Sequence, residues 1–505
     1  MKSINLSMGL LLATLAVAPN VNAQRRMMPE LTDEQKMLDV MHRTITSEKL
    51  FGYVTQLSDP ALEGRLAGSK GMEKAIEIVE GYYKNFGLEP AGDKGTYFQQ
   101  FNQPFIEVTG ECGMEILFPV KGIDKKADTW VRKSYPWADG WFTGGSTASG
   151  DIEADIVYCG YGVTAPELGY DDYKGIDVKG KIVLIEGETP NHSQDSVDIK
   201  KWYHHTLHAV KMKNAYDHGV AGVLYKWVPG PGVPYQENFL YCNVTDTVVS
   251  DIFSGTGRTY KECIQKIRDT FKPQSFNTGK RARIKMTTTY NPNGVGKNIF
   301  GMVKGSERPD EYVIVAAHLD HLGMIPYHIA GANDNNAAVA VMLGAAEALA
   351  KSPIKPKRTV VFMAVDGEES NLTGSTYYTK NPLFPQDKVK AVLNLEQPGA
   401  GEIMVGMYNY LYPQFAEIAN KVNDKYIHRQ LMTRENHFLT RPRTDGAVFM
   451  QAGYPCMDLR AAGGGFYHHP KDDVDTINPE ILQSEAEWLF WMAMEWGNVG
   501  IMKNY

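Results

Sequence analysis

A buried strand that ends abruptly in polar residues is the feature that most constrains this chain. Residues 312–317 read YVIVAA, an unbroken apolar run typical of strands covered on both faces of a sheet. The run stops at HLD (residues 318–320), and GAND (residues 331–334) then precedes an alanine-rich segment that is predicted to form a helix ending before Pro353. Polar groups at the end of one strand and the start of the next helix lie where open α/β sheets bind ligands.

The same arrangement occurs twice more downstream. Residues 359–365 (TVVFMAV) end in DGEE at residues 366–369, and residues 389–395 (VKAVLNL) end in Glu396. Near the C-terminus, a glycine-rich segment leads to His468. The strand ends and adjoining loops therefore carry nitrogen and oxygen ligands that suit zinc, and the candidates are His318, Asp334, Glu369, Glu396 and His468.

Five such residues and a spare carboxylate exceed what a single zinc ion needs. Two ions that share a bridging carboxylate would use all five and leave Glu368 free to act as a base. Two divalent ions about 3.5–4 Å apart can lower the pKa of a shared water toward 7. Glu368 can take the proton of that water and later deliver it to a leaving amine. The pattern predicts a hydrolase with two metal ions.

The composition is that of an ordinary globular protein. The 505 residues are 43% hydrophobic and 22% charged, which is enough chain for two or more domains. The net charge of −7 and the lack of a long basic run argue against nucleic acid as a partner. Five cysteines, none in a CxxC pair, argue against a structural zinc site and leave one or two disulfides open.

The N-terminus has the pattern of a secretory signal. Lys2 precedes an apolar core at residues 8–17, and Val21-Asn22-Ala23 provides the small residues of a cleavage site. No other apolar run is long enough to span a bilayer. We therefore expect a secreted or periplasmic protein, cleaved after Ala23, with no membrane anchor.

The character of the sequence changes twice along the chain. Helices are predicted over residues 32–57 and 71–86, and short strands and turns rich in glycine, aspartate and aromatics follow. The α/β pattern then returns and continues to the end. We expect a mostly parallel, mixed sheet flanked by helices, formed by residues 30–115 and 289–505, with a smaller β-rich domain inserted at residues 116–288.

Six short motifs resemble, in this order, the two-zinc exopeptidase family of bacterial aminopeptidases and glutamate carboxypeptidase. They lie between residues 310 and 476 and read HLDHLG, GANDNNAA, DGEESNLTGS, NLEQPG, TDGAVF and YHHPKDD. A weaker resemblance covers residues 45–102, where LEGRLAGSKG and GLEPAG look like the N-terminal segment of the family. The inserted region, with DVKGKIVLIEGE and GVAGVLY, resembles the protease-associated domain that many members carry.

The resemblance implies how the two zinc ions are held. Asp334 would bridge both ions. His318 and Glu396 would complete the site of one ion, and Glu369 and His468 would complete the site of the other.

It also implies the catalytic roles. Asp320 would orient His318, and Glu368 would be the general base. Tyr467, directly before the ligand His468, would stabilise the tetrahedral oxyanion, as in the glutamate carboxypeptidase branch.

Two positions depart from the family pattern. The family usually has Asp where this chain has Glu396, and a His follows the Asp of its TDG-like motif where this chain has Gly446. The first departure affects the coordination geometry expected at the metal ion that Glu396 would bind. The second, at Gly446, affects contacts expected with the substrate.

Other polar residues have plainer interpretations. A histidine after a strand is usually a structural or surface residue, and we interpret His321, His328, His437 and His469 in this way. Arg441 and Arg443 could clamp a substrate carboxylate, but a role in surface solubility is the simpler interpretation.

The motifs favour a secreted zinc aminopeptidase that acts on peptides. A carboxypeptidase or dipeptidase of the same fold is the alternative among enzymes, and a glutaminyl cyclase is more distant. A metal-free, receptor-like relative belongs to a different class and would have lost ligands, whereas every ligand position here carries a competent side chain.

Overall fold

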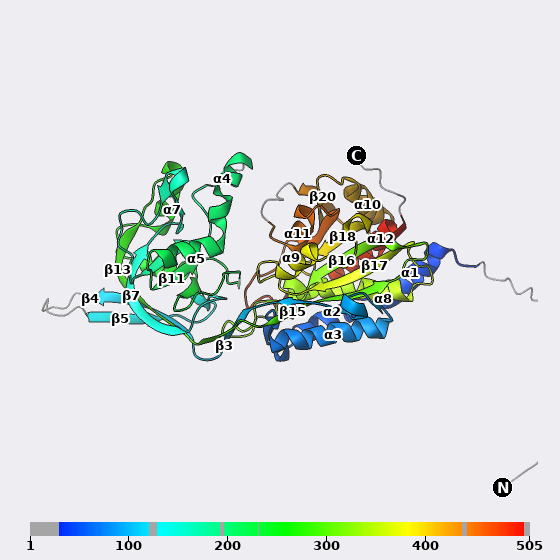
Figure 1. Cartoon of the computed structure of the whole chain (residues 1–505), viewed down its shortest axis with the longest axis horizontal. Helices are drawn as coiled ribbons and strands as arrows, with labels where there is room; N and C mark the ends of the chain where they lie inside the picture. The colour runs from blue at the N-terminus through cyan, green and yellow to red at the C-terminus, as the bar shows by residue number, and fades with distance from the viewer. Residues whose placement is uncertain (1–29, 121–128, 192–195, 231, 437–441, 499–505) are drawn as a thin grey trace, which may run out of the picture.

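The computed structural model describes residues 30–120, 129–191, 196–230, 232–436 and 442–498, which form two lobes (Figure 1). A sheet of nine strands forms the centre of the main lobe, in the order β1-β15-β17-β16-β18-β21-β19-β20 with β2 paired to β15. A sheet of eight strands forms the centre of the inserted lobe, in the order β5-β4-β13-β7-β10-β11-β12-β6. The chain leaves the main lobe after β2 and returns to it at β15.

The main sheet is mixed, as predicted, and its central strands β17, β16, β18 and β21 run parallel to one another. Strands β15 and β19 pair antiparallel on either side of this group. The strands are β1 (Glu89–Pro90), β2 (Phe98–Asn102), β15 (Val295–Val303), β16 (Arg308–His318), β17 (Arg358–Val365), β18 (Val389–Leu395), β19 (Ile403–Asn409), β20 (Leu431–Asn436) and β21 (Cys456–Ala462).

Helices cover both faces of the main sheet (Figure 1). The helices are α1 (Asp33–Thr44), α2 (Ser47–Leu57), α3 (Lys70–Phe86), α8 (Ala337–Lys351), α9 (Thr373–Lys380), α10 (Gln414–Val422), α11 (Asp445–Gln451) and α12 (Pro479–Asn498). Alternate residues of β16 enter different cores: Val313 and Val315 pack toward α8 and α12, whereas Ile314 and Ala316 pack toward α9 and α11. Burial on both faces explains why this strand is an unbroken apolar run.

The N-terminal helical region contains one break that the prediction missed. Thr32 and Gln35 form a capping box at the start of the first helix. The expected single helix ends at Thr44, and Thr46 starts a second one by accepting a hydrogen bond from the amide of Lys49. Helix α3 ends at Gly87, whose φ of 79° is left-handed.

The inserted lobe contains helices as well as strands. Its sheet comprises β4 (Gly113–Val120), β5 (Thr129–Ser134), β6 (Trp141–Thr143), β7 (Gly150–Tyr158), β10 (Ile182–Glu186), β11 (Gly222–Lys226), β12 (Leu240–Val244) and β13 (Phe276–Met286). Its helices are α4 (Ser196–Thr206), α5 (His208–Asp217), α6 (Asp246–Phe253) and α7 (Tyr260–Thr270), and β8 (Thr164–Ala165) pairs with β9 (Tyr170–Asp171). The chain passes between the lobes twice, and each connecting segment forms a short strand. These strands, β3 (Phe105–Val108) and β14 (Thr288–Asn291), pair with each other.

Two further expectations concern the membrane and the cysteines. The predicted signal at residues 1–23 lies outside the described residues. Among the helices that are described, none has the length and apolar character needed to cross a bilayer. All five cysteines are free thiols, and four of them are buried.

Candidate metal centre

The predicted ligands come together at one edge of the main sheet. His318 is the last residue of β16, Glu369 follows β17 and Glu396 follows β18, so their side chains emerge where the parallel strands end. Asp334 lies just before α8, and His468 lies in the loop after β21. All five are nearly inaccessible to solvent, with exposed fractions between 1% and 8%.

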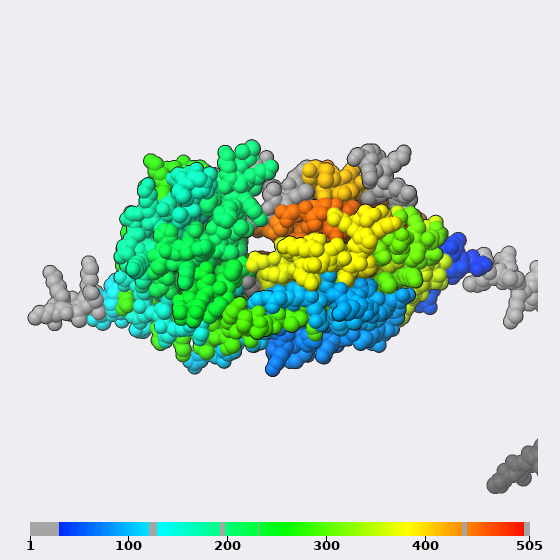
Figure 2. Space-filling model, in the orientation of Figure 1, coloured from blue at the N-terminus to red at the C-terminus, as the bar shows by residue number. Residues whose placement is uncertain are grey.

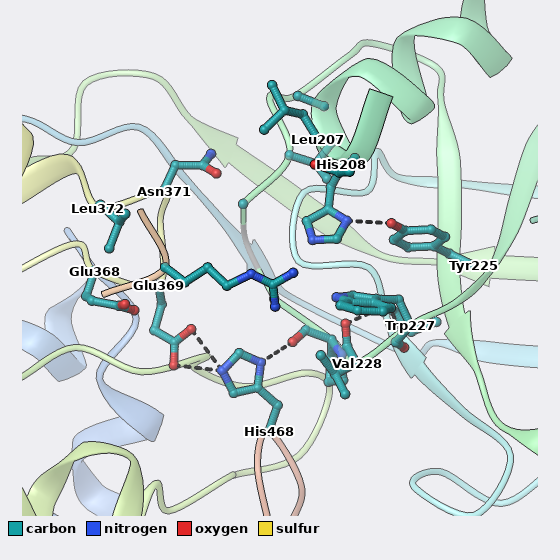
Figure 3. Close-up of a pocket in the computed structure, with 18 of the residues that line it drawn as sticks. Leu207, His208, Tyr225, Trp227, Val228, Glu368, Glu369, Asn371, Leu372 and His468 are labelled. Atoms are coloured by element: carbon teal, nitrogen blue, oxygen red, sulfur yellow. Dashed lines mark hydrogen bonds and ion pairs between the residues drawn. The ribbon is translucent and has the colours of Figure 1, made fainter. Parts of the chain in front are cut away.

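Asp334 lies between two groups of these ligands. Its Oδ1 atom is 3.3 Å from Nε2 of His318, and its Oδ2 atom is 3.5 Å from Nε2 of His468. On the first side, Nε2 of His318 is 3.7 Å from Oε1 of Glu396. On the second side, Nε2 of His468 is 3.0 Å from both carboxylate oxygens of Glu369 (Figure 3). Asp334 is thus the residue common to both groups.

The adjacent residues Glu368 and Glu369 join different groups. Glu368 offers a carboxylate oxygen within 4.8 Å of ligand atoms of His318 and Glu396. Glu369 instead contacts His468. The two carboxylates therefore serve different halves of the site.

The sequence interpretation treated His321 as a structural or surface residue, and the structure places it in the interior beside the candidate ligands. Its ring is fully buried, and Nδ1 lies 3.0 Å from Oε1 of Glu369. His321, Asp334 and Glu369 offer ligand atoms within 4.8 Å of one another. The repeated histidine in HLDHLG is the signal that could have identified it, because both imidazoles follow the same buried strand.

Burial and charge shift the pKa values of the site residues. Burial raises the pKa of Glu368 well above its ordinary value; the charge of Glu396 adds to this effect, and His318 opposes it. Burial lowers the pKa of His318, but the carboxylates of Glu368 and Glu396 outweigh it and hold that pKa well above its ordinary value. Burial raises the pKa of Glu369, but His468 and His321 outweigh it and hold that pKa well below its ordinary value.

Several buried atoms at this edge have no hydrogen-bond partner among the described residues. They are Nε2 of His318, Oδ2 of Asp334, Oε2 of Glu396 and Nε2 of His321. Buried polar atoms are normally paired, and buried carboxylates need a compensating cation. Imidazole nitrogen and carboxylate oxygen are ligands that zinc accepts. The residues therefore fit divalent metal ions.

Asp320 links His318 to the glutamate pair. Its Oδ1 and Oδ2 atoms accept hydrogen bonds from the amides of Glu368 at 3.0 Å and Glu369 at 3.1 Å. Its backbone oxygen lies 3.1 Å from Nδ1 of His318, while its carboxylate is 3.7 Å from the same nitrogen. The carboxylate thus fixes the backbone of both glutamates, a contact that the sequence did not predict.

Two asparagines hold the segment that carries Glu396. Asn335 donates to the carbonyl of Leu395 at 3.0 Å and accepts from the amide of Gln397 at 2.9 Å. Asn333 accepts from the amide of Gly399 at 2.8 Å. The strand end that positions Glu396 is therefore tied to the loop that carries Asp334.

Asp472, in the YHHPKDD motif, is a further residue of the site that the sequence did not single out. Its carboxylate accepts hydrogen bonds from the amides of Asn333 at 2.8 Å and Asp334 at 3.0 Å. These bonds fix the backbone of the residue shared by both groups of ligands.

A buried arginine contacts the loops that carry His318 and Asp334. Arg65 lies in the LEGRLAGSKG segment and is fully buried. Its guanidinium donates to the backbone carbonyl of Leu57 and to those of three residues that are distant in sequence, namely Leu319, Ala330 and Gly331. Burial lowers its pKa to about 10, against the opposing effect of nearby carboxylates. Arg65 therefore remains charged at neutral pH and ties the ligand-bearing loops together.

A cavity of about 410 Å³ opens beside the ligands, between the two lobes (Figure 3). The main lobe contributes Glu368, Glu369, Arg443, Tyr467 and His468 to its lining, and the inserted lobe contributes Trp227, Val228, His208 and Tyr225. Figure 2 shows the hollow between the lobes from outside. The cavity can admit a substrate to the ligands.

Tyr467 lies at this cavity with 53% of its surface exposed. Its ring stacks on that of His468, with the ring centroids 3.8 Å apart. On the other side of His468, Nδ1 donates to the backbone oxygen of Pro229 in the inserted lobe.

Fold and site together define the class: an α/β protein with two groups of candidate metal ligands at the strand ends of a mixed sheet. Residues 298–492 match the family model described as Peptidase family M28.

Curated relatives are similar over part of their length. A probable glutamate carboxypeptidase VP8 from Zea mays is 32% identical over 181 residues, which cover 32% of this chain and 24% of the relative. A glutamate carboxypeptidase 2 homolog from Caenorhabditis elegans is 23% identical, covering 46% of this chain and 36% of the relative. The chain thus spans about a quarter to a third of these proteins.

Solved structures share the fold along nearly the whole chain. The aminopeptidase from Aneurinibacillus sp. strain AM-1 has a TM-score of 0.62 at 18% identity, covering 94% of this chain and 98% of that structure. A Peptidase M28 precursor from Shewanella amazonensis SB2B has a TM-score of 0.63 at 19% identity, covering 93% and 98%. BSAP, a zinc aminopeptidase from Bacillus subtilis, has a TM-score of 0.58 at 19% identity, covering 89% and 95%.

Proposed function

We propose that this protein is a zinc-dependent metallo-exopeptidase, and specifically an aminopeptidase that removes N-terminal residues from peptides. The observation that carries the proposal is the pair of ligand groups that share Asp334 and border a cavity between the lobes. The family match over residues 298–492 and the zinc aminopeptidase with the same fold support it.

The proposal includes two zinc ions per chain. Asp334 would contact both, His318 and Glu396 would hold one, and Glu369 and His468 would hold the other. When bound, the ions supply Lewis acidity toward the scissile carbonyl and the attacking water.

The protein's own groups move the protons. Glu368 lines the cavity and takes a proton from the attacking water, then gives it to the leaving amine. Asp320 holds the backbone of Glu368 in place during both transfers. The hydroxyl group of Tyr467, at the same cavity, donates a hydrogen bond to the carbonyl oxygen as negative charge develops on it.

Arg443 favours a second candidate, a carboxypeptidase or dipeptidase of the same fold. It lines the cavity with Glu368 and His468, where a guanidinium can bind the C-terminal carboxylate of a peptide. The buried carboxylates of the site favour the free α-amine of an aminopeptidase substrate instead. The two candidates differ in which end of a peptide must be unblocked.

Two broader parts of the proposal rest on sequence patterns. The region at residues 116–288 is proposed as a protease-associated-like domain that shapes the cleft. Export is proposed from the leader pattern at residues 1–23, and sequencing of the mature N-terminus in the native host should begin at Gln24.

The test combines metal analysis with substrate preference. The purified protein should contain two equivalents of zinc and cleave aminoacyl substrates but not N-blocked peptides. Cleavage of N-blocked peptides with a free C-terminus would support the carboxypeptidase instead. A protein that binds no zinc and cleaves neither series would overturn the proposal.

A further inference from the structure

His321 is held rigidly beside the site. Its amide donates to the carbonyl of Arg65 at 3.0 Å, in a short bridge that pairs Leu66 with His321. Its ring packs against Gly331, where an added Cβ would lie 2.6 Å from the imidazole Cδ2 atom. Backbone and ring are both fixed, so the imidazole is presented to the site in one orientation.

The ring faces the second group of ligands. Nδ1 of His321 lies 3.0 Å from Oε1 of Glu369, the same oxygen that is 3.0 Å from Nε2 of His468. The His321 and His468 rings lie 5.7 Å apart between centroids and are nearly perpendicular. One carboxylate oxygen is therefore approached by two imidazole nitrogens, an arrangement expected where all three groups bind a common cation.

The two halves of the site are unequal. The first half offers one imidazole, from His318, together with the carboxylates of Glu396 and Asp334. The second half offers two imidazoles, from His321 and His468, together with the carboxylates of Glu369 and Asp334. Four protein ligands close a tetrahedral zinc site, whereas three leave a position open for substrate or water.

We propose that His321 is a fourth protein ligand of the ion held by Glu369 and His468, an inference that rests on the proposed metallo-exopeptidase function. His321 would add a second imidazole to the residues that hold this ion. The ion at His318 and Glu396 would be held by one imidazole and by carboxylates.

An alternative role for His321 is to orient Glu369 through a hydrogen bond alone. His321→Asn separates the two roles, because an amide can place a donor near the Nδ1 position but provides no imidazole nitrogen for zinc. His469→Asn is the matched control. His469 also adjoins the ligand His468, but it is only partly buried and its Nδ1 accepts from the amide of Lys471.

The experiment titrates metal-stripped, full-length protein with zinc against a chromophoric chelator. Wild type and His469→Asn should bind two equivalents tightly. His321→Asn should keep one and bind the other at least about 100-fold more weakly, since even loss of an outer hydrogen-bond partner costs about 10–100-fold. Two equivalents bound with wild-type affinity by His321→Asn would overturn the inference. A wild type that binds no zinc would overturn the proposed function itself.

A second measurement needs no variant. X-ray absorption of the zinc-loaded wild type counts the imidazoles around the metal. A total of three imidazoles bound to the two ions would support His321 as a ligand. A total of two would refute the inference, and this result would stand even if His321→Asn failed to fold.

Discussion

The backbone oxygen of Pro229 in the inserted lobe lies 2.5 Å from Nδ1 of His468 in the main lobe. The carbonyl can only accept, so Nδ1 carries the proton and Nε2 faces Glu369 and Asp334 with its lone pair. The inserted lobe therefore fixes the tautomer of a proposed metal ligand, although it contributes no side chain to either ligand group. This contact couples a lobe without ligands to the metal centre.

The first prediction concerns this contact. Removing residues 229–232 should withdraw the carbonyl and weaken the ion at His468 about 10–100-fold, while the ion at His318 is unaffected. Pro229→Ala keeps the backbone oxygen and should bind zinc as the wild type does. Competition titration with a chelator measures both. Unchanged affinity in the shortened protein would show that the contact has no influence on the metal.

The second prediction separates the adjacent glutamates. Glu368→Gln should keep both zinc ions and lose about 10²–10⁴-fold or more in kcat, because the amide cannot take a proton. Glu369→Ala should lose the ion at His468. Zinc analysis and kinetics on the same preparations check both results. If Glu368→Gln instead loses zinc, Glu368 is a ligand and the base is another residue.

The third prediction concerns Glu396, where the chain departs from the family pattern that its motifs resemble. Glu396→Asp shortens the side chain by one methylene, about 1.5 Å. The backbone cannot follow, because Asn335 holds Leu395 and Gln397. Glu396→Asp should therefore weaken the ion at His318 selectively, and Glu396→Ala should leave about one equivalent bound. Two tight equivalents in the alanine variant would make Glu396 a bystander.

The fourth prediction concerns Arg65. A lysine at this position has one nitrogen and cannot reach the four carbonyls that the guanidinium serves. Arg65→Lys should lower the free energy of unfolding by about 2–4 kcal/mol, since it leaves buried carbonyls unpaired. It should also weaken zinc binding, because the loops of His318 and Asp334 lose their common support. Urea unfolding with and without zinc measures both effects, and an unchanged midpoint would contradict this role.

The positions of the candidate ligands at the strand ends were predictable from sequence because local patterns mark the ends of the strands. His318 and Glu396 each interrupt an apolar run that only a doubly buried strand explains, so their place at one sheet edge followed from topology. The mixed sheet and helix α8 were predictable for the same reason.

The residues that the sequence did not assign act through contacts across long stretches of chain. Arg65 meets Leu319 at a separation of 254 residues, Asp472 meets Asn333 at 139, and His468 meets Pro229 at 239. No local periodicity encodes such pairs. His321 differs from these residues, since it repeats the nearby His318 in a local motif and was given the commoner, structural interpretation.

The last prediction concerns stability at a distance from the metal centre. Glu485 on α12 is fully buried in the core, and neither of its carboxylate oxygens has a hydrogen-bond partner among the described residues. Burial raises its pKa well above the ordinary value, and Arg429 offsets this only in part. Below the ordinary pKa, the folded and unfolded chains are both protonated and folding carries no ionisation penalty. As the pH rises above the ordinary pKa, the unfolded chain releases a proton from Glu485 that the folded chain keeps. The free energy of unfolding therefore falls by about 1.4 kcal/mol per pH unit until Glu485 also ionises in the folded chain.

Glu485→Gln removes this dependence and should therefore stabilise the protein increasingly from pH 4.5 to pH 7.5. Urea unfolding of wild type and variant at both values gives the difference, in which the contribution of bound metal cancels. Glu480→Gln on the same helix is the control, because its side chain is 83% exposed and should show no such trend. A Glu485→Gln variant that is less stable than wild type at pH 7.5 would show that the carboxylate is ionised and satisfied in the fold.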